Sequence, residues 1–177
     1  YLQKDKDFKS TLTKIKASEA DAIVWGGLED TAATLTKQAR ELGLQQKLLM
    51  FDAVCTDNYI TLSGDTSIGV LCSVTGVPLS EMPEGAAFKE RFEKRFNGQK
   101  VQGFAPFAYD AVYTVVEAIK KAGTTEDSAK VAAAMEGIQA KGLSGNIAFE
   151  PSGERKDGMI TILEQKGKEF VPIDKAR

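Results

Sequence analysis

The sequence predicts an α/β fold in which helices flank a parallel β-sheet. Two apolar runs, residues 22–25 and 47–52, are typical of strands, and each ends on a residue able to contact a ligand. A stretch with helical periodicity separates them, so they are expected to pair in parallel as a βαβ unit. Ligands bind outside the carboxyl ends of the strands in such sheets. Trp25 and Asp52, which end the two runs, are therefore expected to face one crevice.

The helix between these strands is predicted over residues 28–42. Its apolar residues recur every three or four positions and form one stripe: Leu28, Ala32, Leu35, Ala39 and Leu42. Glu29 and Asp30 lie in the first turn, where negative charge favours the positive end of the helix dipole. Gly43 follows the last turn and is placed to end the helix.

The rest of the first hundred residues continues with helices and strands. The further elements expected here are a helix that Asp7 caps, a short helix from residue 56 or 57 to 64, a strand over 68–74 and a helix from 83 to 97. In the last of these helices Phe88, Phe92 and Phe96 are spaced four residues apart, which predicts a core stripe.

Residues 104–142 break the alternation of strands and helices. Two helices are predicted there, 104–122 and 127–137, with no strand between them. The first carries a stripe of apolar residues: Phe107, Ala108, Ala111, Val112, Val115 and Ile119. We expect this segment to be a separate unit that packs on another part of the protein. The elements expected after it are a short strand over 146–149 and a hairpin of 159–163 with 169–173.

The composition is ordinary for a globular domain and excludes several classes of function. The 177 residues, of which 42% are hydrophobic and 27% charged, suffice for one large domain or two small ones. The net charge of −2 argues against a nucleic-acid partner, and no apolar run approaches the roughly 20 residues that cross a bilayer. The chain starts at Tyr1 rather than Met, which indicates a mature product, a fragment or a trimmed form.

The sequence favours binding over catalysis. It has no histidine, which is the commonest general base and zinc ligand, and it lacks glycine-rich phosphate loops and a Gly-x-Ser-x-Gly elbow. No cofactor and no metal are therefore expected. The two cysteines, Cys55 and Cys72, match no metal motif. Two partly buried thiols are favoured over a disulfide, because spacing alone does not establish the geometry of a bridge.

Four stretches of the chain share their order and spacing with one known family. They are residues 7–24, Trp25-Gly26-Gly27, Ala108-Tyr109-Asp110-Ala111-Val112, and Gly145-Asn146-Ile147-Ala148-Phe149-Glu150-Pro151-Ser152-Gly153. Through them the chain resembles the branched-chain amino-acid (leucine/isoleucine/valine) binding group of the type I periplasmic binding proteins, which serve ABC importers. The resemblance extends nearly end to end.

This resemblance implies two α/β lobes that close on a ligand. Residues 1–102 and 144–177 would then belong to the second lobe. Residues 104–142 would be a helical segment that crosses back to the first lobe. Most of the first lobe, and the opening strand and helix of the second, would lie outside this sequence.

The resemblance also implies three ligand-binding residues, and the backbone freedom of glycine adds Gly26 as a fourth. Trp25 would cover the bound amino acid, and Gly26 would let the backbone come close to it. Asp52 would bind the ammonium group, and Phe104 would line the side-chain pocket. The family often has tyrosine at the position of Trp25 and glutamate at the position of Asp52. Because these two residues differ here in size and reach, the implied ligand is a small amino acid that is either branched-chain or related.

Each of these four residues also has a structural alternative. Trp25 fits a core indole, and Asp52 fits a turn or helix-cap residue. Gly26 fits a tight turn, and Phe104 fits ordinary helix packing.

The expected function is that of a substrate-binding protein without catalytic activity. It would capture a small amino acid outside the cytoplasm, in the periplasm or extracellularly, and deliver it to the permease of an ABC transporter. Lipid anchoring is left open. Two alternatives remain: a ligand-sensing receptor or regulator of the same fold, and a flavodoxin-like enzyme fragment that uses Asp52 or Asp57 as an acid.

Overall fold

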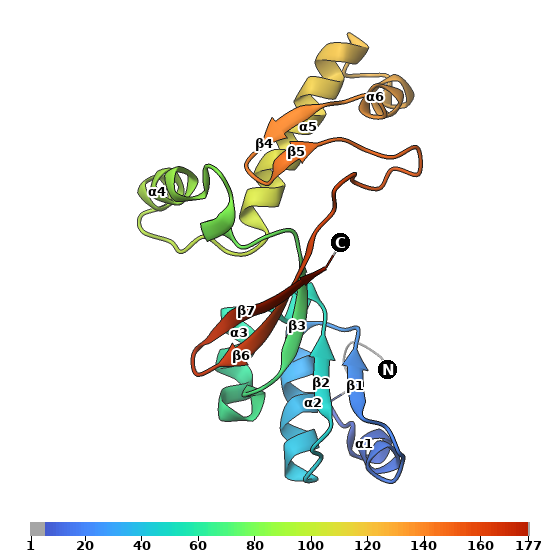
Figure 1. The fold of residues 1–177 in the computed structure, drawn as a ribbon, viewed down its shortest axis with the longest axis vertical. Coiled ribbons are helices and arrows are strands. Elements are labelled where there is room, and N and C mark those ends of the chain that lie inside the picture. Colours follow the sequence, from blue (N-terminus) through green and yellow to red (C-terminus); the bar gives the residue numbers. More distant parts are fainter. Residues whose placement is uncertain (1–5, 177) are drawn as a thin grey trace. The chain divides into compact units, whose positions relative to one another are not determined.

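The computed structural model describes residues 6–176, which form two compact units (Figure 1). Unit 1 contains the described residues up to Thr75 together with Ile160–Ala176, and unit 2 contains Gly76–Met159. The helical segment expected over 104–142 lies wholly within unit 2, which extends beyond it at both ends. The assignment of these parts to the lobes of a larger protein stays a prediction.

Five strands of the described residues form the sheet of unit 1, in the spatial order β1-β2-β3-β6-β7. Their bounds are β1 Ala22–Trp25, β2 Lys47–Met50, β3 Leu71–Thr75, β6 Ile160–Lys166 and β7 Glu169–Ala176. The first three strands pair in parallel, whereas β6 runs antiparallel to both β3 and β7. The sheet is therefore mixed, because the predicted hairpin adds β6 and β7 to the parallel strands through a turn at Gly167-Lys168.

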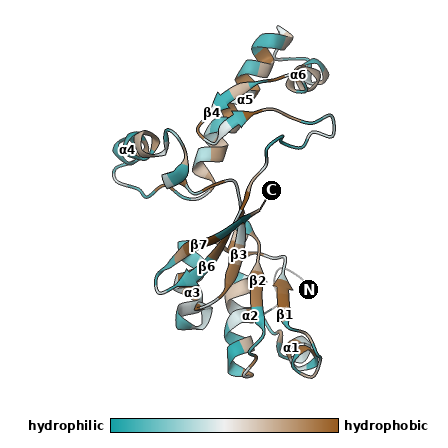
Figure 2. Ribbon diagram, in the orientation of Figure 1, coloured by the Kyte–Doolittle hydropathy of each residue, from teal (hydrophilic) through white to brown (hydrophobic). Residues whose placement is uncertain are grey.

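Three described helices pack on one face of this sheet and share one hydrophobic core with it. They are α1 (Lys9–Lys16), α2 (Glu29–Glu41) and α3 (Asp57–Ser63). Ile23 and Trp25 of β1 lie in this core, and Leu48 and Met50 of β2 lie beside them. Val24 points to the opposite face and is 63% exposed, as expected from the alternation of side chains along a strand. Figure 2 shows that β1, β2 and β3 are mostly hydrophobic.

Local signals set the helix ends in unit 1. The helix α2 begins and ends within one residue of the prediction, and Gly43 after it has a φ of +71°, which favours glycine. Thr56 caps α3, since its Oγ1 accepts a hydrogen bond from the Tyr59 N–H at 3.0 Å. Before α1, Asp7 Oδ1 accepts a hydrogen bond from the Lys9 N–H at 3.0 Å, although the cap position itself falls one residue after Asp7.

Short 3₁₀ turns shift two strand ends away from their expected positions. β2 ends at Met50, two residues early, because the turn η1 (Asp52–Val54) follows it. β3 begins at Leu71, three residues late, because the turn η2 (Gly64–Ser67) leads into Gly69, whose φ is +81°. Strand boundaries thus depend on backbone turns that hydrophobicity does not reveal.

The described residues of unit 2 form three helices and a two-stranded sheet. Their bounds are α4 Gly85–Arg95, α5 Ala105–Ala122, α6 Ser128–Met135, β4 Ala140–Gly142 and β5 Gly145–Ile147, with a 3₁₀ turn η3 at Leu79–Glu81. The two consecutive helices predicted from the sequence are confirmed as α5 and α6, whereas β4 was not predicted. Among residues 6–176, no helix is both long and apolar enough to cross a membrane.

The predicted phenylalanine stripe of α4 is confirmed only in part. Phe88 is buried, but Phe96 is 46% exposed, so its place in the core was wrong. The physical reason is that α4 ends at Arg95, so Phe96 lies beyond the helix and outside its buried face. Its ring still contacts that of Phe92, at a centroid distance of 4.6 Å.

Candidate functional site

The parallel strands of unit 1 end close together at one edge of the sheet. Trp25 pairs with Met50, and Met50 pairs with Cys72, so β1 and β2 end side by side while β3 continues for three residues to Thr75. A hollow of about 280 Å³ opens there, and its lining residues are Phe51, Asp52, Ser73, Val74, Thr75 and Ile160. This is where α/β sheets usually bind ligands, because the loops that follow the strands surround the carboxyl ends.

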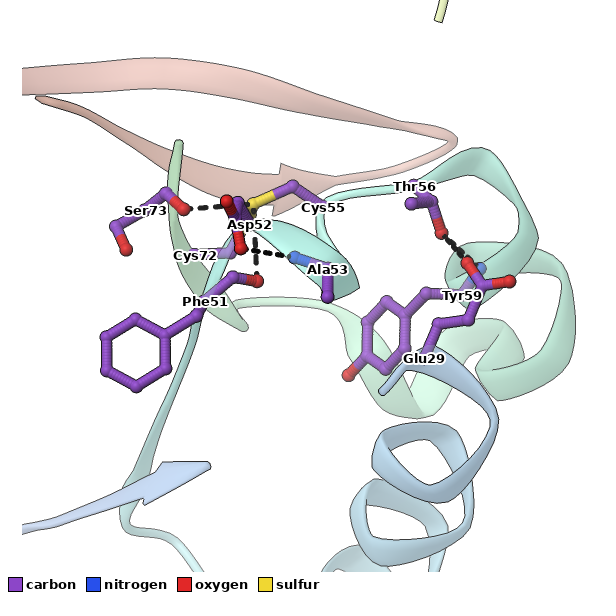
Figure 3. The surroundings of a disulfide bond; sticks show 9 residues. All are labelled: Glu29, Phe51, Asp52, Ala53, Cys55, Thr56, Tyr59, Cys72 and Ser73. Carbon is purple, nitrogen blue, oxygen red and sulfur yellow. Dashed lines mark hydrogen bonds between the residues drawn. A yellow bond between two sulfur atoms is a disulfide. The ribbon is translucent and has the colours of Figure 1, made fainter. Parts of the chain in front are cut away.

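Asp52 contributes a negative charge to this hollow. It starts the turn η1 directly after β2 and is half-buried. Its Oδ1 accepts a hydrogen bond from the Ala53 N–H at 2.8 Å, which holds the carboxylate against its own turn (Figure 3). Within residues 6–176 no lysine or arginine forms an ion pair with this carboxylate. It is therefore accessible to a positively charged ligand group.

Trp25 does not line the hollow. It is 8% exposed and lies in the core of unit 1, where its ring meets that of Phe8 edge to face at a centroid distance of 5.3 Å. The expectation that Trp25 and Asp52 face one open crevice is therefore not met within unit 1. The position of Trp25 fits the alternative interpretation of a core indole, and a direct ligand contact stays a prediction.

The aromatic ring beside Asp52 is instead that of Phe51, which was not among the residues predicted to bind the ligand. Phe51 is 51% exposed and lines the hollow. Gly26 lies next to it, because a Cβ placed on Gly26 would come within 3.6 Å of Phe51 Cε2, an ordinary contact distance. The structure thus brings Gly26, Phe51 and Asp52 together. Strand alternation was the available signal, since Met50 faces the core and the next residue faces the other way.

Phe104 belongs to unit 2 and is described there. It occupies the cap position before α5 and is 54% exposed, and its carbonyl oxygen accepts a hydrogen bond from the Ala108 N–H at 2.9 Å. The ring is thus largely exposed rather than packed into unit 2. Its role in a side-chain pocket stays a prediction.

Cys55 and Cys72 form a disulfide bond, which overturns the expectation of two free thiols (Figure 3). They are 17 positions apart in the sequence, but their Cα atoms are only 5.9 Å apart, within the range that a bridge requires. Cys55 follows η1, and Cys72 lies in β3. The thiol interpretation was wrong because the turn η1 folds the chain back toward β3, which spacing alone does not show.

Asp110, in the 108–112 motif, is hydrogen-bonded to residues 143 and 144, which directly precede the 145–153 motif. This carboxylate is 5% exposed and accepts hydrogen bonds from the Leu143 N–H at 2.7 Å and from the Ser144 N–H at 2.8 Å. The Ser144 hydroxyl donates a further bond to it, and Arg155 donates to that hydroxyl oxygen at 2.8 Å. A buried aspartate therefore anchors the turn between β4 and β5 to α5.

One face of α5 is apolar and exposed. The buried side of the helix carries small or polar residues: Pro106, Asp110, Thr114 and Ala118. Most of the predicted apolar stripe lies on the other side, where Val112 is 62% exposed and Val115 is 41% exposed, whereas Phe107 is half-buried against a core cluster of unit 2. Exposed apolar surface of this extent on one helix is typical of an interface with another part of a protein.

The fold and the hollow together define an α/β domain with a candidate site at the carboxyl ends of parallel strands. The chain belongs to the periplasmic binding protein family, whose sequence model matches residues 1–169. Family membership agrees with the resemblance stated above, and the family is one of binding proteins.

Two relatives illustrate the similarity. The amino acid binding protein of Pseudomonas aeruginosa is 31% identical over 168 residues, which cover 93% of this chain and 44% of that protein. The leucine-, isoleucine-, valine-, threonine-, and alanine-binding protein of the same organism is 28% identical over 161 residues, covering 90% and 42%. The chain thus spans less than half the length of these relatives.

Solved structures confirm the predicted fold class. The leucine binding protein LivK of Thermotoga maritima aligns with a TM-score of 0.86 and 22% identity, over 99% of this chain and 50% of that one. The substrate binding protein LivJ of Streptococcus pneumoniae, in complex with isoleucine, aligns with a TM-score of 0.77 and 20% identity, over 98% and 51%. The architecture is therefore that of a type I periplasmic binding protein, of which this chain covers about half.

Proposed function

We propose that this chain is part of the substrate-binding protein of an ABC importer, which captures a small amino acid outside the cytoplasm. The observation that carries the proposal is the Asp52 carboxylate, which lies in a hollow at the strand ends without an ion-pair partner among the described residues. The relative named amino acid binding protein, which is 31% identical, supports an amino acid as the ligand class.

The chemistry of the hollow suits one end of a zwitterion. A free amino acid needs an anion for its ammonium group, polar donors for its carboxylate and an apolar wall for its side chain. Asp52 supplies the anion, and the exposed ring of Phe51 supplies apolar surface beside Gly26. In a closed cleft, removing one partner of such a charge pair typically costs about 2–5 kcal/mol. The donors for the ligand carboxylate would come from the first lobe.

The rest of the site would come from the other lobe of a larger protein. Unit 1 would belong to the second lobe, and the α5–α6 segment over 104–142 would belong to the first lobe and supply Phe104. Two open surfaces support this proposal. The apolar face of α5 is exposed within unit 2, and β1 forms an edge of the sheet whose second face exposes Val24. Parallel strands usually have both faces covered.

The location and the partner follow from the same proposal. A disulfide such as Cys55–Cys72 forms and persists in oxidising compartments, which supports a place outside the cytoplasm. The partner would be the permease of the importer, which would recognise the closed, ligand-bound lobes. The protein would carry out no chemistry of its own.

A ligand screen on the full-length protein tests the proposal. Thermal unfolding is measured with each of the common amino acids, and one or a few of them should raise the unfolding temperature. Calorimetric titration with those amino acids should then show that Asp52→Asn lowers the affinity by at least about 30-fold, since a lost charge pair costs about 2 kcal/mol or more. The matched control is Asp57→Asn, which changes an exposed carboxylate outside the hollow and should leave affinity unchanged.

Two results would contradict the proposal. If no amino acid stabilises the full-length protein, the ligand class is wrong. If Asp52→Asn binds the amino acid as tightly as the unchanged protein, Asp52 does not form part of the site.

A further inference from the structure

We infer that the Cys55–Cys72 disulfide is a positioning element of the binding site, because it fixes the turn that carries Asp52 against the end of β3. The inference rests on the proposed function and extends it. Cys55 and Cys72 are not among the expected ligand contacts, and the inference gives them the role of positioning the Asp52 carboxylate.

The backbone ladder does not hold Asp52 in place. β2 and β3 pair at only two positions, Leu49 with Leu71 and Met50 with Cys72. The pairing of β1 with β2 also ends at Met50. Beyond that residue the chain leaves the sheet and enters η1, so the segment with Asp52 has no strand partner on either side.

The opposite wall of the hollow is held firmly. Ser73, Val74 and Thr75 belong to β3, and each pairs with a residue of β6. The hollow therefore has one wall within the sheet and one wall on a turn outside it. The geometry of the site depends on how that turn is fixed relative to β3.

The disulfide joins these two walls (Figure 3). Cys55 lies three residues after Asp52, directly behind η1, and Cys72 lies directly before Ser73 in β3. Cys72 is 1% exposed, so the bridge is anchored in the core of unit 1. The Cys55 Sγ also lies 3.8 Å from the carbonyl oxygen of Ser73, which places the end of the turn directly against that wall.

Other contacts hold the turn from the side away from the hollow. Val54 is fully buried, and Thr56 is tied to α2 through a hydrogen bond from its hydroxyl to Glu29. These contacts keep the turn near the sheet without the bridge. We therefore expect loss of the disulfide to leave the fold in place and to let the turn sample positions in which Asp52 no longer faces the hollow.

The inference predicts a specific loss of affinity. If the turn keeps the binding position about a tenth of the time without the bridge, the apparent dissociation constant rises about tenfold. The experiment uses the full-length protein with Cys55→Ala and Cys72→Ala together, titrated with L-leucine, L-isoleucine, L-valine, L-threonine and L-alanine in turn. Circular dichroism at the titration temperature checks that the variant is folded.

A second readout separates positioning from general stability. Hydrogen exchange of the amides at residues 53–55 is measured without ligand, and these amides should exchange faster in the bridge-free variant while those of β1 and α2 stay unchanged. If the bridge-free variant does not fold, the titration and the hydrogen exchange are repeated on the unchanged protein after a phosphine has reduced its disulfide. The Asp57→Asn protein, the matched control used above, keeps Asp52 and the bridge. Reducing its disulfide should therefore raise its apparent dissociation constant by the same factor of about ten.

The outcomes distinguish this inference from the proposed function. If the unchanged protein binds none of the five amino acids and no other amino acid in the screen, the proposed function fails and the inference fails with it. If the unchanged protein binds but bridge loss leaves the affinity or the exchange at residues 53–55 as before, only the inference is overturned. Faster exchange together with weaker binding supports it.

Discussion

The two units of this chain differ in how they bury α-helices. In unit 1, three helices turn their apolar sides to the sheet and share one continuous core with it. In unit 2, the longest helix, α5, buries a side that carries Asp110 and Thr114 and exposes the side that carries Val112. Helical periodicity alone would assign the apolar side of every helix to the interior.

This difference shows which surfaces each unit completes by itself. In unit 1 the described helices cover one face of the sheet, and the core on that face is formed by the described residues themselves. Among the described residues, unit 2 has smaller apolar clusters, against which only Phe107 of the α5 stripe packs, and hydrogen bonds of Asp110 also hold α5 in place. The exposed part of the stripe is therefore available to another surface, which under the proposed function would be the remaining lobe.

The largest expected effect tests the core of unit 1. Trp25→Ala should lower the free energy of unfolding of the full-length protein by about 3–5 kcal/mol, because it leaves a large cavity in a packed core. Denaturant unfolding measures this loss. Trp25→Phe serves as the control, since it keeps an aromatic ring in the core. A loss of ligand affinity in the folded Trp25→Phe variant would instead favour the direct ligand contact predicted from the sequence.

The next effect tests the polar anchor of unit 2. Asp110→Ala should cost about 3 kcal/mol, because it leaves the buried N–H of Leu143 and the half-buried N–H of Ser144 without this acceptor. Denaturant unfolding gives the size, and hydrogen exchange should place the loss at the turn between β4 and β5. Glu117→Ala, on an exposed part of the same helix, is the control and should change stability by less than about 0.5 kcal/mol. If Asp110→Ala also changed the free energy of unfolding by less than about 0.5 kcal/mol, Asp110 would not anchor α5, and the contrast with the apolar packing of helices in unit 1 would be lost.

The smallest effect tests what covers α5. In the full-length protein Val112→Ala should cost about 1–2 kcal/mol, because we expect the exposed valine to be buried there against the remaining lobe. Lys120→Ala on the exposed, polar end of the same helix should cost little. If both substitutions leave the stability of the full-length protein unchanged, the apolar face of α5 is not an interface within the protein.

Local sequence patterns were sufficient for most helices and for the first strands. The stripe and the terminal residues of α2 fixed its ends within one residue, and the Thr56 hydroxyl marked the start of α3. These predictions succeeded because helix formation and capping depend on residues within a few positions of one another. Strand ends were less predictable, since η1 and η2 depend on backbone turns.

The candidate site was predicted only in part. Asp52 and Gly26 lie together at the strand ends, but the neighbouring ring is Phe51 rather than Trp25. The order of apolar residues located the end of β1 correctly but placed the end of β2 two residues too late. It did not show that Trp25 turns toward the core and Phe51 turns away from it, because the direction of each side chain depends on how the neighbouring strands pack against the helices.

The sequence by itself determined the α/β class, the helices and the family, because these follow from periodicity, capping and the order of motifs along the chain. The tertiary structure decided the Cys55–Cys72 bridge, the buried position of Trp25 and the exposed face of α5. Each of these depends on residues that are distant in sequence and become neighbours only when the chain folds. Local patterns fix elements, whereas contacts between elements decide which side chains are buried, bridged or open to a ligand.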